Sequence, residues 1–569
     1  MKSRLLIILF CCIPLLFQAQ KYDNTWVTGY AGVGPQYGNS FLTFTDGSLI
    51  IDSIYASAPF QDNNASFSRF DGQFFAHFNG NHIRDQSFLG MQNGTYLNEE
   101  ISINYDMSDD DLTQGAMFLP YPGHPDSVML VYLSSEYLVD SGLVTDVVSS
   151  DISYAIIKMS DNDGKGKVVD LKKSFVHDTL QFGHLQAVKH ANGRDWWILI
   201  MEYSGNRFYR ILFDTLGLHT PEIQSISKKV YAGAGMNKFS PDGTKYVGYN
   251  GDTFLPTGSS IDIFDFDRCT GLLSNQQQFK MKGEYGGIAI SPNSRYLYQA
   301  LGDTVFQYDL QSQNIWDTRT IVALYDGFED PFQVKFYQFQ LAPDNKIYIT
   351  ATTSTQYLHV INQPDEPGLN CDFRQHGVKL LKFYYASIPN HPNYRLGPVD
   401  GSSCDSLGID NLPKAWYRYE QDTLDPLQVS FHDLSFYEPG SWTWDFGDGS
   451  PGSTERHPGH LFDHPGIYQV CLTVSNGNGT DTHCKTLYLG VSAQENPVLQ
   501  NQILVSPNPF TDFLSVSLSA TLRSPVFHLY DLAGREICAS KMELGINEVK
   551  LGTLARGSIF GRCVRGQKW

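Results

Sequence analysis

The sequence predicts an all-β protein that folds as several domains. A chain of 569 residues is too long for one hydrophobic core. Aromatic residues make up 13% of the chain, with 32 Tyr and 36 Phe, and these residue types are favoured in strands. The 50 Gly and 27 Pro fit the many turns of a protein built from short strands. We expect a β-propeller of about seven blades, then an immunoglobulin-like β-sandwich, and finally a small C-terminal β-sandwich.

Charge limits the partners that the protein can have. The formal net charge is -19 at pH 7, so long-range attraction to nucleic acid is unfavourable. An acidic surface of this kind keeps an exported protein soluble. We therefore expect no nucleic-acid partner.

Residues 1–20 are predicted to be a secretory signal peptide. Lys2 and Arg4 supply the positive charge, a short apolar stretch follows, and cleavage is expected near Ala19 or Gln20. The apolar stretch is too short to span a membrane, and no other segment approaches that length. We expect a Sec-exported protein with no transmembrane segment.

Residues 21–400 contain an internal repeat whose clearest marker is a proline turn. Pro241, Pro292 and Pro343 follow one another at intervals of 51 residues, each between a Ser or Ala and an Asp or Asn. An apolar segment precedes each turn and an alternating apolar segment follows it, which is typical of two strands joined by a tight turn. Residues 190–197 fit one period earlier. A period of about 50 residues with several short strands predicts one propeller blade per repeat.

The number of blades depends on how the ring closes. Six repeats are visible, and residues 40–51 and 378–385 are expected to form a seventh blade from both ends of the segment. Six to eight blades stay open, with seven favoured. The Ser-Pro-Asp-Gly turn at residues 240–243 resembles the blades of WD-like and TolB-like propellers, which implies a ring around a central channel.

A polar linker is expected at residues 401–414, followed by a compact domain at residues 415–491. The motif Trp-Asp-Phe-Gly-Asp-Gly at residues 444–449 is followed at residues 460–476 by a Pro-Gly turn and a strand pattern. This combination resembles the signature of PKD domains, which are small immunoglobulin-like β-sandwiches of surface proteins. The resemblance implies an extracellular protein with a scaffolding or binding role.

A second linker, residues 492–501, leads to a final module at residues 502–569. The module begins with Pro-Asn-Pro at residues 507–509 and later carries Leu-Tyr-Asp-Leu-Ala-Gly-Arg at residues 529–535. This order resembles the C-terminal sorting domain of the bacterial type IX secretion system. After Gly557 the sequence departs from the alternating strand and basic tail of that family. The resemblance implies a Bacteroidetes-type surface or secreted protein that has the type IX secretion machinery as a partner.

Seven cysteines follow the predicted signal peptide, and export permits disulfides. Cys471 and Cys484 flank a Gly-Asn hairpin turn whose register places them opposite each other, so we predict a disulfide between them. Cys371 and Cys404 are a second candidate pair, with two free buried thiols as the alternative.

Exposed aromatic side chains are the candidate binding elements, because their faces stack on sugar rings and on proline-rich peptides. Trp196 and Trp197 stand together within one predicted blade, and Trp442 precedes Trp444 in the PKD-like motif. Adjacent strand residues point to opposite faces, so at most one of Trp196 and Trp197 is free. The alternative for all three side chains is a place in the core.

Three acidic segments invite a metal-binding interpretation. Residues 161–167 resemble a calcium loop only faintly, because Lys165 stands where an oxygen ligand is needed, so a hairpin is preferred. Residues 106–111 fit a solvated acidic loop. Asp445 and Asp448 have the spacing of a turn whose carboxylates bond to the backbone. We therefore expect no metal ion and no cofactor.

The sequence holds no His-Glu-x-x-His, Gly-x-Ser-x-Gly or phosphate-binding motif, so we assign no catalytic residue and expect no enzyme. The leading hypothesis is a secreted or cell-surface binding or adhesion protein whose propeller and PKD modules bind polysaccharide or an extracellular protein. One alternative is an exported hydrolase or lyase, which would place clustered carboxylates or histidines near the propeller channel. The other alternative is a purely structural surface component.

Overall fold

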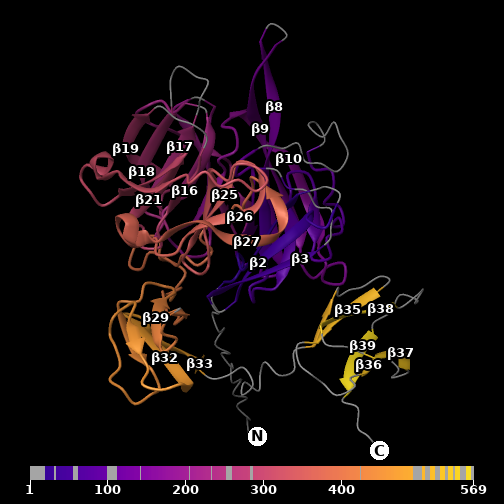
Figure 1. Cartoon of the computed structure of the whole chain (residues 1–569). Coiled ribbons are helices and arrows are strands. Elements are labelled where there is room, and N and C mark those ends of the chain that lie inside the picture. Colours follow the sequence, from indigo (N-terminus) through magenta and orange to yellow (C-terminus); the bar gives the residue numbers. More distant parts are fainter. Residues whose placement is uncertain are drawn as a thin grey trace, which may run out of the picture.

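The computed structural model describes residues 20–30, 34–45, 47–54, 60, 62–98, 112–140, 143–203, 205–231, 233–251, 259–281, 286–422 and 424–490, and the strand residues 503–506, 513–518, 526–531, 536–541, 545–550 and 559–564. These residues form strands, turns and two short 3-10 segments, η1 (Ile315–Thr318) and η2 (Gly368–Cys371), with no α-helix among them (Figure 1). The fold is all-β, as the composition predicts.

Within the described part of the chain before residue 386, the strands form seven antiparallel sheets. The first two sheets are β1 (Thr25–Tyr30), β2 (Gly38–Thr45), β3 (Ser48–Ile54) and then β4 (Ala65–Ser68), β5 (Phe74–Phe78), β6 (Ile83–Asp85). The third and fourth are β7 (Ala116–Pro120), β8 (Ser127–Asp140), β9 (Leu143–Lys158), β10 (Lys167–Leu180) and then β11 (Gln186–Lys189), β12 (Trp196–Met201), β13 (Arg207–Asp214), β14 (Gly217–Leu218), β15 (Glu222–Ser225).

The last three sheets have four strands each. They are β16 (Ala234–Phe239), β17 (Lys245–Gly251), β18 (Ser259–Asp267), β19 (Leu272–Met281); then β20 (Ile288–Ile290), β21 (Tyr296–Leu301), β22 (Thr304–Asp309), β23 (Thr320–Leu324); then β24 (Phe336–Leu341), β25 (Ile347–Ala351), β26 (Ser354–Ile361), β27 (Phe373–Tyr385).

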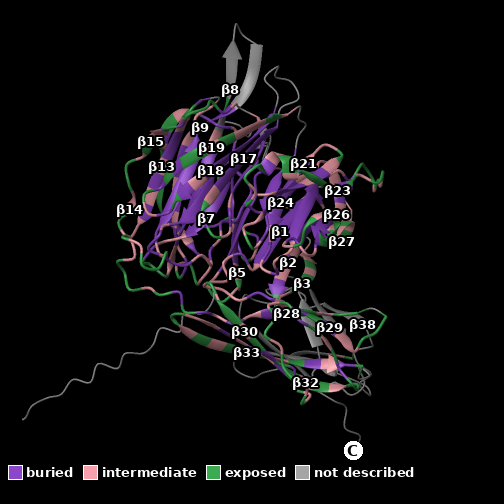
Figure 2. Cartoon of the chain, turned by 90° about the vertical axis from the view of Figure 1, so that its left-hand side faces the viewer, coloured by how far each residue is buried: buried purple, intermediate pink, exposed green. Residues whose placement is uncertain are grey.

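The seven sheets are the blades of a closed ring. The first strands of neighbouring sheets contact one another, as β4 does with β7 and β16 with β20. Each cluster of buried apolar side chains in this region lies between two neighbouring sheets. The cluster that closes the ring packs Tyr348 and Leu358 of the seventh sheet against Trp26 and Phe44 of the first. Figure 2 shows these buried strands gathered in the interior. Because each blade buries its faces against its neighbours, the fold is a β-propeller.

The repeated proline turns share one hydrogen-bonding pattern. The residue after each proline accepts a hydrogen bond, through its side-chain oxygen, from the backbone N–H two positions further on. These N–H to Oδ1 contacts are Thr244 to Asp242 (3.0 Å), Arg295 to Asn293 (3.0 Å) and Lys346 to Asp344 (3.1 Å). Only Asp or Asn makes such a turn readily, which explains the repeat seen in the sequence.

The ring closes differently from the prediction. Residues 40–51 belong to β2 and β3, in the sheet of β1. Residues 378–385 belong to β27, which pairs with β26, so the two segments lie in adjacent blades and not in one. They still meet, because the Lys382 N–H donates to Ser40 Oγ at 3.0 Å. The sequence pattern of a strand does not distinguish a partner in the same sheet from one in the next sheet.

Residues 386–398, which we call the plug, leave the seventh blade and cross the ring. The plug's Asn390 exchanges hydrogen bonds with the third and fourth blades, through the carbonyl oxygens of Ala116 and Leu185 and the side-chain amides of Gln114 and Gln186. The Tyr394 hydroxyl donates to the Phe118 carbonyl oxygen at 2.7 Å. Most plug residues are buried, and hydrogen bonds from Ile388 and Asn390 to four blades place them in the central channel, where an enzyme site was one alternative.

Residues 415–490 fold as a β-sandwich of two three-stranded sheets. The strands are β28 (Tyr417–Gln421), β29 (Gln428–Asp433), β31 (Gly459–Leu461) in one sheet and β30 (Ser441–Asp445), β32 (Gly466–Asn476), β33 (Gly479–Leu489) in the other. Trp444 is 1% exposed at the centre of the core, and its indole N–H donates to the Glu455 carbonyl oxygen at 2.9 Å. The Trp-Asp-Phe-Gly motif therefore holds the two sheets together.

The structure contains two disulfides among its described residues. Cys471 and Cys484 are bonded across β32 and β33, as the hairpin register predicts. The predicted pair Cys371 and Cys404 is wrong: Cys404 is bonded to Cys269, and Cys371 is a free, buried thiol. Cys371 lies in the core between the sixth and seventh blades, out of reach of the linker that carries Cys404.

The strand residues described beyond residue 502 form two further three-stranded antiparallel sheets. One holds β34 (Ile503–Ser506), β35 (Phe513–Leu518), β38 (Gly545–Lys550), and the other holds β36 (Val526–Asp531), β37 (Glu536–Lys541), β39 (Ile559–Val564). None of the helical segments that the structure describes has the length and apolar character needed to cross a bilayer. The predicted signal peptide, up to residue 19, and the linker at residues 492–501 lie outside the described residues.

Candidate functional site at the domain junction

Arg418 of β28 joins the sandwich to the propeller. Its guanidinium donates to the Asp344 carbonyl oxygen at 3.0 Å and also contacts Glu420. Glu420 in turn accepts from the Lys346 ammonium at 2.7 Å. Gly47 of the first blade lies so close to Arg418 that a Cβ at Gly47 would be 2.6 Å from the Arg418 Cβ. The two domains are therefore in direct, charge-paired contact.

The linker between the domains is fixed at both ends. The Cys269–Cys404 disulfide bonds it to the fifth blade, across 135 residues of sequence. Asn476 and Asn478 of the sandwich donate to the Asn411 carbonyl oxygen and the Asp400 carboxylate, at 2.6 and 2.7 Å. A segment that the composition predicts to be a polar linker thus holds the sandwich in one position.

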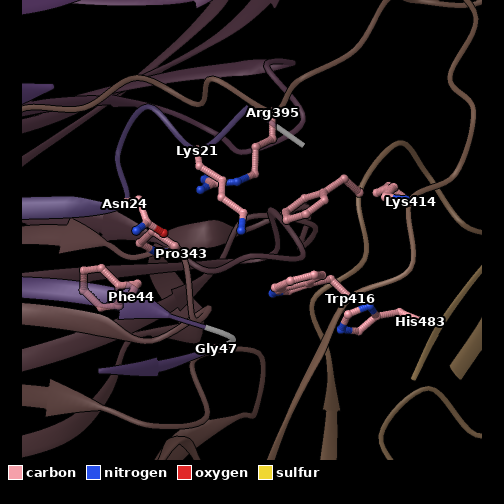
Figure 3. Close-up of a pocket in the computed structure, with 10 residues that line it drawn as sticks. Lys21, Asn24, Phe44, Gly47, Pro343, Arg395, Lys414, Trp416 and His483 are labelled. Atoms are coloured by element: carbon pink, nitrogen blue, oxygen red, sulfur yellow. The ribbon is translucent and has the colours of Figure 1, made fainter. Parts of the chain in front are cut away.

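A pocket of about 280 Å³ lies at this junction (Figure 3), and we call it the aromatic pocket. Both domains and the plug contribute to its lining, which comprises Lys21, Asn24, Phe44, Gly47, Pro343, Arg395, Lys414, Trp416, Phe436 and His483. Apolar rings and cationic side chains predominate, and no carboxylate lines it. In a chain with a net charge of -19, this pocket is a local concentration of positive charge.

Trp416 forms one wall of the aromatic pocket. The indole is half-buried and stacks on His483, with ring centroids 4.3 Å apart and an interplanar angle of 28°. The Lys21 ammonium lies 4.9 Å from the centre of the Trp416 ring (Figure 3). Such a cation and ring pair attract each other through the ring quadrupole.

The three cations of the aromatic pocket differ in their partners. Arg395 is paired with the buried Asp23, at 2.6 Å, and Lys414 is paired with Asp481, at 3.0 Å. Lys21 has no carboxylate within ion-pair distance among the residues that the structure describes. Lys21 is therefore the cation that is available to an acidic ligand.

The aromatic residues predicted as binding elements are not at the surface. Trp196 is 0% exposed, between the third and fourth blades, with the Lys189 ammonium 4.2 Å from its ring. Trp197 is 7% exposed, and its indole N–H donates to the Arg268 carbonyl oxygen at 2.9 Å. The prediction is wrong for both, because β12 is apolar throughout and neighbouring blades cover both of its faces.

Trp442 is half-buried at the edge of the sandwich core, where Arg456 lies 5.4 Å from its ring centre. It therefore stays a minor surface feature and takes no part in the aromatic pocket. Trp416 and Lys21 were not predicted from the sequence. The sequence shows only that Trp416 comes directly before the first strand of the sandwich. No sequence pattern links Trp416 to Lys21.

Two of the three acidic segments act as turns. The Asp445 and Asp448 carboxylates accept from the backbone N–H groups of Gly447 and Ser450, at 2.9 and 3.0 Å. Residues 161–167 join β9 to β10, as a hairpin. No group of three or more metal-ligating side chains occurs in the described part of the chain. Residues 106–111 lie outside the described residues.

Three buried histidines of the propeller are far apart among the described residues. His77, His184 and His359 are buried singly in different blades, and burial lowers the pKa of each imidazole, to about 3, 4 and 3 respectively. These imidazoles are neutral at physiological pH. Their rings lie against apolar and aromatic neighbours such as Phe336 beside His359, so they pack as core residues.

Fold and site together define a class: a multidomain all-β protein in which a propeller and a β-sandwich enclose a cationic, aromatic pocket. Residues 419–491 match the family model of the PKD domain. The chain is similar to the PKD1 domain of Vibrio cholerae metalloprotease PrtV, with 30% identity over 14% of this chain and 99% of that chain, at a TM-score of 0.13. Residues 419–491 therefore belong to the PKD domain family.

Two similar structures extend over most of the chain. One is a putative 6-phosphogluconolactonase from Bacteroides fragilis, with 11% identity over 64% of this chain and 96% of that chain, at a TM-score of 0.35. The other is the periplasmic gluconolactonase of Pseudomonas aeruginosa, with 12% identity over 74% of this chain and 99% of that chain, at a TM-score of 0.30. At these values neither likeness bears on what this chain binds or catalyses.

Proposed function

We propose that this protein is an exported surface protein that binds acidic polysaccharide in the aromatic pocket. The observation that carries the proposal is the Lys21 ammonium, which lies over Trp416 without a carboxylate partner among the described residues. The leading hypothesis from the sequence, a binding or adhesion protein, is thereby given a site.

The lining of the aromatic pocket fits a sugar acid better than a neutral sugar. Trp416, Phe436 and Pro343 offer flat apolar surfaces, on which the C–H face of a pyranose ring packs. Lys21 supplies a charge-assisted hydrogen bond to a carboxylate. A uronic acid residue presents both chemistries on one ring.

The domain composition supports an extracellular location. A PKD domain is typical of extracellular proteins and favours a surface role. Export by the type IX secretion machinery, with the module at residues 502–569 as its sorting domain, stays a proposal that rests on the Pro-Asn-Pro and Leu-Tyr-Asp-Leu-Ala-Gly-Arg motifs.

The proposal assigns binding and no catalysis. The plug supports this assignment, because Asn390 bonds to several blades at the centre of the ring, where a propeller enzyme would gather its catalytic groups. The buried histidines His77 and His359 pack against aromatic rings of the blade cores, and the described residues hold no group of three or more metal-ligating side chains.

A retention experiment tests this function. The full-length protein is incubated with calcium pectate and calcium alginate as acidic polysaccharides, with cellulose as a neutral one, and with collagen beads. We expect retention on an acidic polysaccharide, loss of retention in Trp416→Ala, and normal retention in the control Trp442→Ala. No new reducing ends are expected in the supernatant. Retention on collagen alone, or release of sugar product, would contradict the proposal.

A further inference from the structure

A second cavity, of about 340 Å³, lies beside the aromatic pocket, and we call it the turn cavity. The repeated proline turns of the fifth, sixth and seventh blades form one side of it, and the plug and residues 434–438 of the PKD domain form the others. Asp242 and Glu438, at its rim, are exposed, so the cavity reaches the surface. The turns that define the repeat in the sequence therefore also build a cavity.

Lys238 of β16 lines the turn cavity. Lys238 is only 7% exposed, and its ammonium donates to the Gln340 side-chain oxygen at 2.6 Å. An ammonium has three donors, yet Lys238 has one neutral acceptor and no carboxylate at ion-pair distance among the described residues. Burying a cation in this way is costly unless an anion joins it.

The other cations of the turn cavity already have partners. Arg395 is paired with Asp23, and Arg456 with the buried Asp433, at 2.6 and 3.0 Å. Among the described residues, Lys238 is therefore the one cation of the turn cavity that has no counter-ion. A monoanion matches a single charge, whereas a phosphate dianion is normally bound by several unpaired cations.

His391 of the plug is a second side chain of the turn cavity that lacks a hydrogen-bond partner at one atom. The residue is 5% exposed and lines the turn cavity, and its Nδ1 is buried without a hydrogen-bond partner in the described structure. Its carbonyl oxygen accepts from the Gln340 amide at 3.3 Å, so Lys238, Gln340 and His391 form one polar cluster. Burial lowers the pKa of Lys238 to about 7 and that of His391 to about 4. A bound carboxylate would favour the charged form of Lys238.

We propose that the turn cavity is a carboxylate-binding site, in which the Lys238 ammonium pairs with the carboxylate of a sugar acid and His391 completes its hydrogen bonds. Lys238, Gln340 and His391 do not line the aromatic pocket, so the inference goes beyond the function proposed for that pocket. The carboxylate comes either from a free sugar acid or from a uronate residue of a polysaccharide chain.

Isothermal titration of the full-length protein tests the site. D-galacturonate, its trimer and neutral D-galactose are the probes. We expect galacturonate or its trimer to bind, and galactose to bind at least tenfold more weakly. Binding of the monomer indicates a free sugar acid as the source, and binding of the trimer alone indicates a polysaccharide. Equal affinity for galacturonate and galactose would overturn the proposal.

Two variants test whether Lys238 and Gln340 form the carboxylate-binding site. Lys238→Met removes the cation and is expected to weaken galacturonate binding at least tenfold, whereas Lys280→Met, on the exposed β19, leaves it unchanged. Gln340→Glu supplies a carboxylate in place of the amide, so it is expected to raise the melting temperature and abolish binding. Wild-type affinity in Lys238→Met or in Gln340→Glu would overturn the proposal.

Trp416→Ala separates this inference from the proposed function. Monomer binding that survives in Trp416→Ala but is lost in Lys238→Met assigns the carboxylate to the turn cavity. Monomer binding that is lost in Trp416→Ala and kept in Lys238→Met assigns it to the aromatic pocket and overturns the inference alone.

Discussion

Arg418 Nε of the PKD domain donates a hydrogen bond, 3.0 Å long, to the carbonyl oxygen of Asp344, in the proline turn of the last blade. This contact joins the two domains beside the aromatic pocket and the turn cavity, both of which are lined by Pro343, the residue before Asp344. Both cavities therefore depend on a fixed arrangement of propeller and sandwich.

Replacing Arg418 is expected to loosen the domain junction. The Arg418 side chain is only 5% exposed. Arg418→Met removes the guanidinium that bonds to the Asp344 carbonyl oxygen and to Glu420. Leaving the buried Asp344 carbonyl oxygen without this donor costs about 2 kcal/mol, and Glu420, which is 42% exposed and still paired with Lys346, adds little. Thermal unfolding of the full-length protein measures the loss. In Arg295→Met, which breaks an ion pair with Asp309 at the surface, the cost should be much smaller. Equal costs in the two variants would show that the junction adds no stability.

The Cys269–Cys404 disulfide is expected to protect the linker between the domains. With both residues replaced by Ser, the linker loses its covalent attachment to the fifth blade, so trypsin should cleave after Lys414 faster. Mass spectrometry of timed digests measures the rate. The matched change of Cys471 and Cys484 to Ser should leave that rate unaltered. If both double variants are cut after Lys414 at the wild-type rate, the disulfide does not hold the linker.

Asn390 is expected to fix the plug. Asn390→Ala removes its hydrogen bonds to the third and fourth blades and leaves buried polar groups unpaired, at a cost of about 2 kcal/mol. Hydrogen exchange over residues 386–398 measures the effect, and we expect faster exchange there than in the PKD domain. A plug that exchanges as slowly in the variant as in the wild type would contradict this assignment.

The PKD domain is expected to lose stability in acid through Asp448. Burial opposes ionisation of this carboxyl, but hydrogen bonds from Ser450 and His460 outweigh burial and lower its pKa to about 2. A lowered pKa in the folded state means that the carboxylate stabilises the fold above about pH 4 and that this stability is lost as the pH falls toward 2. The gap in melting temperature between the wild type and Asp448→Asn should therefore be wide at pH 6 and narrow at pH 2.5. Ser450→Ala should move the loss to higher pH. A gap that does not change with pH would contradict the assignment.

Local patterns made part of the fold predictable. The 51-residue repeat reflects turns in which an Asp or Asn side chain bonds to the backbone two residues on, so each turn needs only its own residues. The pairing of Cys471 with Cys484 follows from the register of one hairpin. In both cases the residues that interact are close in the sequence.

The domain junction was not predictable, because its residues are far apart in the chain. Cys404 pairs with Cys269 because the linker crosses the fifth blade, which no local pattern indicates. Trp196 and Trp197 look like surface aromatics until both faces of their strand are covered. Lys21 meets Trp416 only after the ring has closed and the PKD domain has docked.

The affinity of tri-galacturonate for Lys21→Met, measured by titration calorimetry beside the wild type and the control Lys280→Met, tests the account most directly. A charge-assisted hydrogen bond is worth about 1.5 to 3 kcal/mol, so we expect Lys21→Met to bind at least about tenfold more weakly while Lys280→Met matches the wild type. Equal affinities in all three proteins, or no binding by the wild type, would contradict the claim that the aromatic pocket binds acidic polysaccharide.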